Sequence, residues 1–520
     1  MLFIIYFLMS FNLFNSSISF NIKNDPKTLD PIFIDPTSMP ITASIYEGLV
    51  KISSTGQITE GLAETFNTEG KSIIFKLRKD AKWSDGSEIE AKDFLFAFKR
   101  LLDQDSLSPY AYLYFSIENA KEFNEGKLSF KEVGIKVLDK KTLKITFNVL
   151  VEEPLKIFGP ILAFTPASPI KKSIYLKNTN AFGNNIKNIL ASGPYEIKKW
   201  ELNNKVNLVV NNYYYEKIQI KELDAYIVRE DKTAINMFKI GDLDLLPLIS
   251  SYYLKEIDKE NLFPYDRDAK VIYLEFNTTG KLIDPNLREA INYAIDREKL
   301  CKNILEDNST PARALIPVNY LGKDKSFRED YGEEIFKENL SKAKKLLDKV
   351  NLEFRKNPLK LLCINTELHT KLSQYIQSEL EEKLGLKIEI HQMPSSIKIA
   401  KVRNGEYDIS LSGWMVDYLA PPFDFLTLYT TTSNNNTTNW HNEEFDKIIQ
   451  KALNAYYTKD KFDLLAIAEK ILFEPSKNSF PIAPLYFGKS YYAKKTWIKN
   501  VNIYAGASSP NFRQTFLENK

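Results

Sequence analysis

The chain is too long to fold around a single hydrophobic core. It has 520 residues, and one core seldom serves more than ~250–300 residues before a chain divides into lobes. Strand and helix patterns are mixed along the whole chain. Residues 73–77 and 143–149 alternate apolar with polar side chains, which is typical of half-buried strands. We therefore expect an α/β protein with at least two lobes.

Three stretches carry apolar residues on one helical face. They predict helices over residues 94–102, 287–295 and 372–384. Asp284 precedes the second of these stretches and is a candidate N-cap. Gly385 follows the third and is a candidate C-cap, because glycine adopts the left-handed conformation that often ends a helix.

The first 19 residues carry no charge and are mostly apolar. The apolar run is shorter than the ~20 residues that a membrane helix needs. The sequence Ser17-Ile18-Ser19 offers small residues at the positions that a signal peptidase reads. We expect a secretory signal over residues 1–19 that is cleaved before Phe20. The alternative is an uncleaved anchor, because the usual basic start is missing. No cysteine occurs in this stretch, which disfavours a lipoprotein.

The charges exclude two classes of partner. The chain has 70 basic and 67 acidic residues, a formal net charge of +3, and no long basic block. Binding to nucleic acid or to an anionic membrane therefore has no electrostatic support. The two cysteines, Cys301 and Cys363, pair only if folding brings them together, and the simpler interpretation is two buried free thiols.

A search for catalytic motifs favours binding over catalysis. There are three histidines, and the HExxH, paired CxxC and GxSxG patterns are missing. The sequence Gly70-Lys71-Ser72 resembles the end of a phosphate-binding loop, but Thr65 stands where the loop needs its first glycine. We predict no catalytic residue, no metal site and no cofactor.

Several short motifs follow one another in a fixed order between about Asn21 and Asn500. They are Leu29-Asp30-Pro31, Tyr46-Glu47-Gly48-Leu49-Val50, the block from Gly61 to Phe94 with Trp83-Ser84-Asp85-Gly86, Ser192-Gly193-Pro194-Tyr195, Gly241-Asp242-Leu243-Asp244, Tyr273-Leu274-Glu275-Phe276-Asn277, Arg288-Glu289-Ala290-Ile291 and Gly413-Trp414-Met415-Val416-Asp417-Tyr418. In this order, the motifs resemble the bacterial extracellular solute-binding proteins of the oligopeptide and dipeptide type, family 5.

The resemblance implies a fold. It is the two-lobed periplasmic-binding-protein-like fold of type II with an extra inserted domain. Domain I would comprise residues 20–48, 169–268 and 480–520, the inserted domain II residues 49–168, and domain III, the second lobe, residues 269–479. Two chain crossings near residues 268 and 480 would form the hinge.

The resemblance also implies a function. The protein would be a periplasmic, monomeric component of an ABC importer, with no enzymatic activity. It would capture oligopeptides between its lobes and deliver them to an inner-membrane permease that works with ATPase subunits. Relatives that bind metal complexes, haem, opines or murein fragments leave a non-peptide solute as an alternative. A chaperone-like or surface interaction protein on the same scaffold is a second alternative.

A buried peptide ammonium needs a carboxylate partner, because an unpaired buried charge is costly. The resemblance assigns this role to Asp417. Its neighbours Gly413, Trp414, Met415 and Tyr418 would line the pocket and offer backbone groups for strand-like pairing with the peptide. The simpler alternatives are a solvated carboxylate for Asp417 and a core position for Trp414.

On the opposing lobe, Asp35, Pro36 and Thr37 resemble the segment that pairs with the peptide from the other side. Arg403 is more typical of a surface charge than of a carboxylate clamp. Leu411 stands where the family has a base for the ligand's carboxyl end, so the sequence leaves that contact, and the ligand's length, open.

Overall fold

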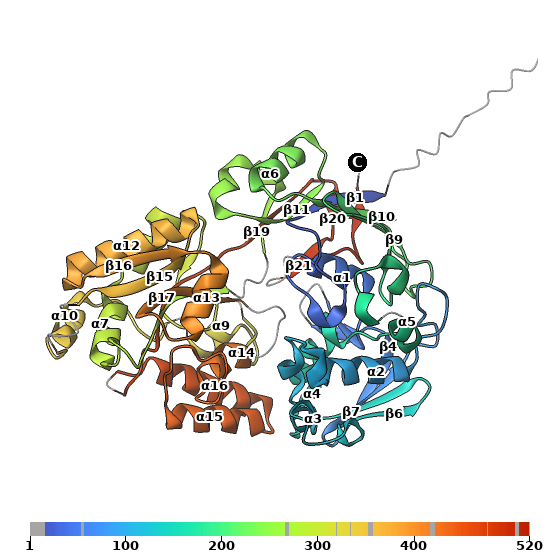
Figure 1. Ribbon diagram of the computed structural model, residues 1–520, viewed down its shortest axis with the longest axis horizontal. Helices are drawn as coiled ribbons and strands as arrows, with labels where there is room; N and C mark the ends of the chain where they lie inside the picture. The colour runs from blue at the N-terminus through green and yellow to red at the C-terminus, as the bar shows by residue number, and fades with distance from the viewer. Residues whose placement is uncertain are drawn as a thin grey trace, which may run out of the picture.

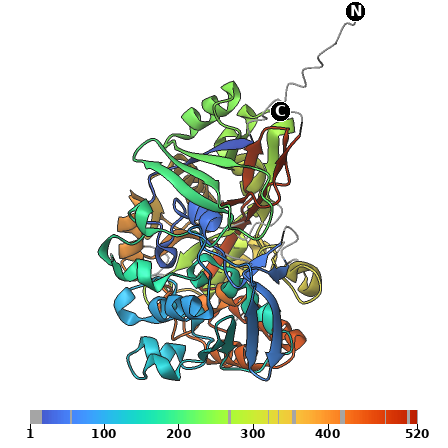
Figure 2. The same ribbon diagram turned by 90° about the vertical axis from the view of Figure 1, so that its right-hand side faces the viewer.

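The computed structural model describes residues 16–53, 57–177, 179–265, 270–318, 320–332, 334–351, 357–415, 422–475, 477–504 and 509–518. Three main sheets organise these residues into two lobes (Figure 1). We call the part built on the seven-stranded and four-stranded sheets the first lobe, and the part built on the six-stranded sheet the second lobe. Figure 2 shows the first lobe face on, with strands of the seven-stranded sheet above those of the four-stranded sheet.

The seven-stranded sheet has the order β12-β19-β11-β1-β10-β9-β8. Its strands are β1 (Ser17–Ile22), β8 (Tyr195–Glu201), β9 (Lys205–Val210), β10 (Glu222–Ile227), β11 (Leu245–Ile249), β12 (Leu262–Pro264) and β19 (Tyr491–Lys494). The strand β1 runs parallel to β10 over its whole length. The helices α1 (Met39–Ile45) and α6 (Asp231–Ile240) belong to the same part of the first lobe.

The four-stranded sheet has the order β4-β5-β7-β6 and is antiparallel. Its strands are β4 (Ala63–Glu69), β5 (Ser72–Leu77), β6 (Ile135–Asp139) and β7 (Thr142–Thr146). The helix α2 (Ala91–Leu102) packs its apolar face against this sheet, where Phe94 and Phe98 are fully buried. The helices α3 (Ala120–Asn124) and α4 (Pro154–Ala163) lie at the lower end of this lobe in Figure 1.

The six-stranded sheet has the order β14-β18-β13-β17-β15-β16. Its strands are β13 (Lys270–Phe276), β14 (Thr310–Pro311), β15 (Leu359–Ile364), β16 (Ile388–Met393), β17 (Ile409–Met415) and β18 (Ile482–Phe487). The longer helices around it are α7 (Pro285–Ala294), α10 (Leu340–Leu347), α12 (Glu367–Leu384), α13 (Ser395–Arg403), α15 (Glu443–Asn454) and α16 (Thr458–Leu472). One large hydrophobic core fills most of this lobe, and Leu362, Val402 and Tyr407 form a small separate cluster.

The predicted elements are present, although the strand expected over residues 143–149 ends at Thr146 and the helix expected over residues 287–295 ends at Ala294. Residues 73–77, 143–146, 94–102, 287–294 and 372–384 lie in β5, β7, α2, α7 and α12. The Asp284 side chain accepts a hydrogen bond from the backbone of Asn286 at 2.8 Å, which confirms the N-cap of α7. Gly385 ends α12 with φ 65°, as expected of a C-cap glycine. Cys301 and Cys363 are both buried and unpaired, which confirms two free thiols.

Two chain segments connect the lobes side by side. The first runs from β12 to β13, and the second from β18 to β19. They are joined by backbone hydrogen bonds from Tyr265 to Ser490 at 2.9 Å and from Gly488 to Lys270 at 3.1 Å. The second crossing lies later than the expected position near residue 480, because β18 pairs with β13 in the second lobe. All six residues of β18 are buried, which suits a strand inside this sheet.

The start of the described chain is part of the first lobe. Ile18 and Phe20 are fully buried in β1, and the Ser19 hydroxyl donates a hydrogen bond to Asp244 Oδ2 at 3.0 Å. A signal that ended at residue 19 would remove half of this strand, so the expected boundary before Phe20 falls within an ordered, buried element. Within the described ranges, no helix combines the length and apolarity needed to cross a bilayer.

The lobes touch near the crossings. Asn308 of the second lobe donates a hydrogen bond to the Tyr491 hydroxyl of β19 at 2.8 Å. Close by, Lys255 and Glu306 form an exposed ion pair across the lobes at 2.9 Å. These contacts surround the connecting segments on the hinge side of the molecule.

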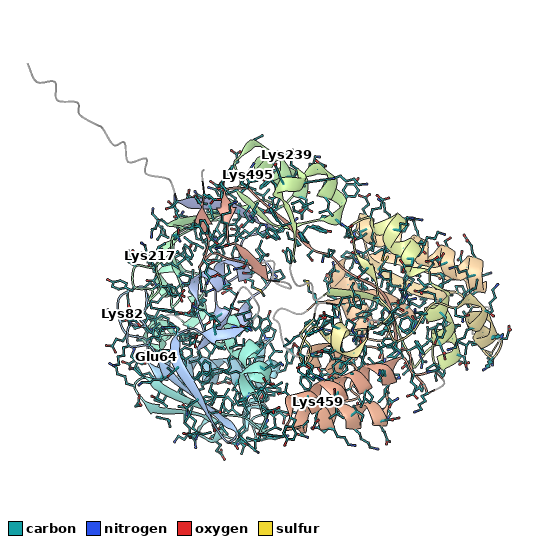
Figure 3. All side chains as sticks on the ribbon, turned by 180° about the vertical axis from the view of Figure 1, so that it is seen from behind. Glu64, Lys82, Lys217, Lys239, Lys459 and Lys495 are labelled. Atoms are coloured by element: carbon teal, nitrogen blue, oxygen red, sulfur yellow. The ribbon has the colours of Figure 1, made fainter. Side chains whose placement is uncertain are left out.

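The lobes also touch at the opposite end. The Thr458 backbone N–H at the start of α16 donates a hydrogen bond to Glu152 of the first lobe at 3.1 Å. Lys156 of α4 donates to the Lys323 carbonyl at 2.5 Å. Figure 3 places Lys459, the second residue of α16, at this lower junction. The two lobes therefore enclose the space between them from both ends.

Candidate functional site

The predicted ligand segment follows directly from a central strand of the second lobe. The strand β17 lies between β13 and β15, and its last residue, Met415, is paired with Lys270. Gly413 is exposed and Met415 is 43% exposed at this end of the strand. Asp417 and Tyr418 lie outside the described residues, so their ligand roles stay predictions.

Gly413 and Trp414 have different packing environments. A Cβ atom at Gly413 would lie 2.4 Å from the Ile272 Cδ1 atom, so a larger residue would displace that side chain. Trp414 is half-buried and packs against the core of the second lobe. Its indole N–H is buried and has no hydrogen-bond partner among the described residues. Trp414 thus has a clear packing role, and its ligand contact stays a prediction.

The predicted contacts of the first lobe lie in the turn before α1. Asp35 Oδ1 accepts hydrogen bonds from the backbone of Thr37 at 2.9 Å and of Ser38 at 2.8 Å. Pro36 is exposed at the tip of this turn. Figure 1 shows α1 on the side of the first lobe that faces the second. The Asp35 carboxylate therefore stabilises the turn, and a ligand contact of Asp35, Pro36 or Thr37 stays a prediction.

Three parallel strands of the second lobe end at the same edge of the sheet. The strand β15 runs parallel to both β16 and β17. Ligands of open α/β sheets bind outside the carboxyl ends of such strands. The segment after β15 carries His369, the segment after β16 carries Lys398, and the segment after β17 carries Asp417. The topology therefore brings the ends of these three strands, at Ile364, Met393 and Met415, to one edge.

The sequence patterns did not single out the basic residues Lys398 and His369 at this edge. Lys398 is 8% exposed, and its Nζ donates a hydrogen bond to the Ser412 hydroxyl of β17 at 3.0 Å. Burial, together with the nearby cations Lys398 and Lys270, lowers the pKa of His369 to about 4. A position directly after a strand, at the start of a helix, is the one sequence signal that could have pointed to His369.

Beneath these cations lies a buried carboxylate. Glu275 of β13 is 6% exposed and accepts a hydrogen bond from Ser412 at 2.9 Å and another from Thr437. Burial raises the pKa of Glu275 and lowers that of Lys398. The Ser412 hydroxyl thus links the Lys398 ammonium to Glu275, which holds the cation in place beside the end of β17.

Two further sequence interpretations can be placed. Leu411 is 2% exposed and belongs to the core, so its side chain faces away from solvent. The basic side chains near the end of β17 are instead Lys270, Lys398 and the neutral His369. Arg403 is exposed at the last residue of α13, which fits the interpretation as a surface charge. No group of three or more His, Cys, Asp or Glu side chains suited to a metal ion occurs in the described part of the chain.

Comparison with known proteins shows where this architecture occurs. Residues 57–436 match the family described as bacterial extracellular solute-binding proteins, family 5 Middle. The oligopeptide-binding protein OppA of Bacillus subtilis is 30% identical over 97% of this chain and 92% of its own length.

Solved structures agree over nearly the whole chain. The substrate-binding domain of an oligopeptide ABC transporter from Bacillus anthracis superposes with a TM-score of 0.79 at 26% identity, covering 97% of this chain and 99% of that one. Listeria monocytogenes OppA bound to peptide gives a TM-score of 0.79 at 25% identity, with 97% and 100% covered. The expected two-lobed α/β fold is therefore confirmed, and the chain belongs to the bacterial extracellular solute-binding proteins of family 5.

Proposed function

We propose that the protein is the extracytoplasmic substrate-binding component of an ABC importer and that it captures oligopeptides between its lobes. The observation that carries this proposal is the full-length likeness to OppA of Bacillus subtilis and to the peptide-bound OppA of Listeria monocytogenes. Both lobes and both chain crossings lie within the shared length. No observation favours a non-peptide solute or a chaperone-like role over peptide capture.

The edge formed by β15, β16 and β17 supplies the chemistry for the two ends of a peptide. Asp417 neutralises the α-ammonium, and the exposed backbone at the end of β17 pairs with the peptide main chain. Main-chain pairing is the same for every peptide sequence, so it suits a carrier of varied peptides. Lys270 and Lys398 give this edge positive charge, which attracts the terminal carboxylate, and the neutral His369 lies beside them.

The remaining steps belong to other subunits. A membrane permease receives the peptide from the closed protein, and separate ATPase subunits drive transport. The protein acts as a monomer outside the inner membrane, after removal of an N-terminal signal that ends at or before residue 16. The peptide leaves the protein chemically unchanged.

The direct test is to identify the ligand that the protein carries. The protein is purified from a periplasmic extract without refolding, and native mass spectrometry weighs the complex before and after denaturation. We expect one short peptide per chain, and calorimetric titration of the stripped protein with defined tripeptides to pentapeptides should restore binding. A stripped protein that binds none of these peptides, or that cleaves them in a way that depends on its own acidic residues, would overturn the proposal.

A further inference from the structure

Tyr491 is bound by both lobes, although it belongs to a strand of the first. Its backbone lies in β19, where it pairs with Ile249 of β11 and Pro264 of β12. Its side chain reaches a turn of the second lobe. The hydroxyl donates a hydrogen bond to the Asp307 carbonyl at 3.1 Å and accepts one from Asn308 Nδ2 at 2.8 Å. Tyr491 is 7% exposed, so this bridge is largely shielded from water.

The turn that binds this hydroxyl comprises residues 306–309, and we call it the hinge turn. It directly follows a π-helix (Cys301–Leu305). Asn308 has φ 60°, in the left-handed region that asparagine tolerates better than most residues. Asp307 Oδ1 accepts a hydrogen bond from the backbone N–H of Ser309 at 3.0 Å, which fixes the turn from within. The second lobe therefore presents the carbonyl and the amide that bind the hydroxyl in a defined geometry.

The hinge turn follows the second chain crossing along one side. Thr310, directly after the turn, pairs with Phe487 at the end of β18. The Ser309 hydroxyl accepts a hydrogen bond from the backbone N–H of Lys489 at 3.2 Å. Tyr491 is the third residue in this series, and alternate residues of an extended chain face the same side. The contacts of the hinge turn thus extend from the sheet of the second lobe, along the crossing, into the sheet of the first.

The Tyr491 bridge differs from the other contacts of this series in the parts that it joins. Phe487 and the hinge turn both belong to the second lobe, whereas the backbone of Tyr491 is held in the first-lobe sheet. A rotation of the lobes therefore displaces the hydroxyl from the hinge turn, and hydrogen bonds weaken steeply when their geometry is lost. The bridge is formed here together with the contact of Glu152 and Thr458 at the opposite end. It therefore belongs to the closed arrangement.

We propose that Tyr491 is a positioning residue of the hinge: its hydroxyl, held by the hinge turn, stabilises the closed angle between the lobes and slows the release of the captured peptide. The effect on peptide release rests on the proposed function, whereas the effect on the lobe angle does not. A peptide enclosed by the lobes leaves after they open, so its dissociation rate reports the stability of the closed arrangement. Loss of a buried hydrogen-bonded hydroxyl should change that stability by a factor of about ten.

The first test needs no ligand. Spin labels on Leu138→Cys in β6 and Ile467→Cys in α16 report the distance between the lobes by double electron–electron resonance. Both positions are exposed, at 53% and 45%, while Cys301 and Cys363 are buried. Ligand-free Tyr491→Phe should populate longer distances more than the wild-type protein with the same labels. Equal distance distributions in the two proteins would overturn the proposal.

The second test measures peptide release. A tetra-alanine peptide with a fluorophore on its third residue is bound and then displaced by excess unlabelled peptide in a stopped-flow fluorimeter. Tyr491→Phe should release it about tenfold faster than wild type, while the association rate should not fall.

The hinge turn supplies a second variant for the same measurement. Asn308→Gly removes the amide and readily adopts φ 60°, so it should also accelerate release. The double variant should be within about twofold of Tyr491→Phe alone, since the two groups act through one bridge. If Tyr491→Phe fails to fold, Asn308→Gly carries both tests, because Asn308 is exposed.

The matched control is Tyr195→Phe, which removes a hydroxyl of the same kind within the first lobe. Tyr195 is 1% exposed and donates a hydrogen bond to the Ile220 carbonyl at 3.1 Å. This variant should lower the free energy of unfolding and leave the lobe distances and the release rate unchanged. A release rate of Tyr491→Phe within twofold of wild type, or an equal acceleration in Tyr195→Phe, would overturn the proposal. A wild-type protein that binds no peptide would contradict the proposed function, and the ligand-free distances would still decide the role of Tyr491.

Discussion

The carboxylate of Glu152 accepts a hydrogen bond from the backbone N–H of Thr458, 3.1 Å away, although the two residues are 306 positions apart in the chain. Thr458 begins α16, and the N-cap residue Tyr457 makes no side-chain capping bond of its own. The Glu152 backbone N–H in turn donates to the Tyr456 carbonyl at 2.9 Å. One lobe thus supplies the cap for a helix of the other, far from the hinge.

This contact predicts an effect on closure. Loss of an N-cap costs about 1 kcal/mol, and here the cap exists only when the lobes are together. Glu152→Ala should therefore shift the ligand-free protein toward a more open arrangement and weaken peptide binding severalfold. Small-angle scattering should show a larger radius of gyration for the ligand-free variant than for wild type, with both converging at saturating peptide.

The control for this prediction is Glu60→Ala, an exposed position of the first lobe. It should leave both the scattering profile and the affinity unchanged. Identical radii of gyration for ligand-free wild type and Glu152→Ala would show that this contact does not hold the lobes together.

The mature N-terminus is the subject of a second prediction. Ile18 is fully buried in β1, and burial of such a side chain contributes about 1.5–3 kcal/mol. A chain that begins at Phe20 should therefore be less stable toward urea than a chain that begins at Ser16, by at least this amount. Mass spectrometry of the protein from its native envelope should find an N-terminus at or before Ser17. Recovery of Phe20 as the first residue of a fully stable protein would contradict the prediction.

A third prediction concerns a buried ion pair of the second lobe. Arg328 and Glu469 are paired with side-chain exposures of 1% and 2%, and Glu469 also accepts hydrogen bonds from the backbone of Leu315 and Ile316. Removing one member of such a pair typically costs about 3–5 kcal/mol. Glu469→Ala should lower the free energy of unfolding by this amount, as measured by urea denaturation.

The comparison for that measurement is an exposed pair in the same lobe. Lys447 and Glu443 are paired on α15 with side-chain exposures of 71% and 73%. Glu443→Ala should therefore change the stability by less than about 0.5 kcal/mol. Equal losses of unfolding free energy in the two variants would mean that the buried Arg328–Glu469 pair does not stabilise the second lobe.

The sequence predicted local elements better than long-range relationships. The spacing of apolar residues and the capping residues located α7 and α12, because these signals lie within each helix or directly beside it. The caps Asp284 and Gly385 are examples. The sequence predicted β18 in the first lobe, although this strand pairs with β13 of the second lobe, and it predicted a signal whose end falls within β1. Both strands have six residues, and their places depend on partners far away in the chain, β13 and β10.

The candidate site was predictable only in part. The motif around Gly413 pointed to the end of β17, because a local motif carries that information. His369 and Lys398 were not predicted as site residues, because they reach the same edge through the parallel pairing of β15, β16 and β17. No spacing rule relates residues that a sheet brings together from separate loops.

The fourth prediction follows from the low pKa of His369. This pKa is about 4 in the ligand-free protein, because of burial and the cations Lys398 and Lys270. A peptide carboxylate beside these cations would raise it toward the ordinary value of about 6.5. The bound state would then hold more proton than the free state between about pH 4 and pH 6.5, so affinity should increase as the pH falls through this range.

Calorimetry at pH 5.5 in two buffers of different ionisation enthalpy measures this proton uptake directly. Wild type should take up a fraction of a proton on binding, and His369→Gln should take up much less. His391→Gln is the control, since that side chain is 43% exposed on β16. Unchanged proton uptake in His369→Gln would mean that the peptide carboxylate does not bind beside His369.

The last prediction concerns Asp417 and the peptide's α-ammonium. Losing one member of a buried charge pair typically costs ~2–5 kcal/mol, and each ~1.4 kcal/mol is tenfold in affinity. Asp417→Ala should therefore weaken binding of free-amine peptides by well over tenfold, as measured by calorimetry. Asp417→Asn should be nearly as damaging, because it keeps the shape of the side chain and loses its charge.

Direct pairing can be separated from general damage by changing the peptide as well. N-acetylation removes the ammonium, so it should weaken binding to wild type and cost much less in Asp417→Ala. Such non-additivity arises only when the two groups interact. The exposed Asp258→Ala in the first lobe is the control, and it should respond to acetylation as wild type does. If a folded Asp417→Ala protein binds free-amine peptides as tightly as wild type, another carboxylate holds the ammonium, and the role of Asp417 is refuted.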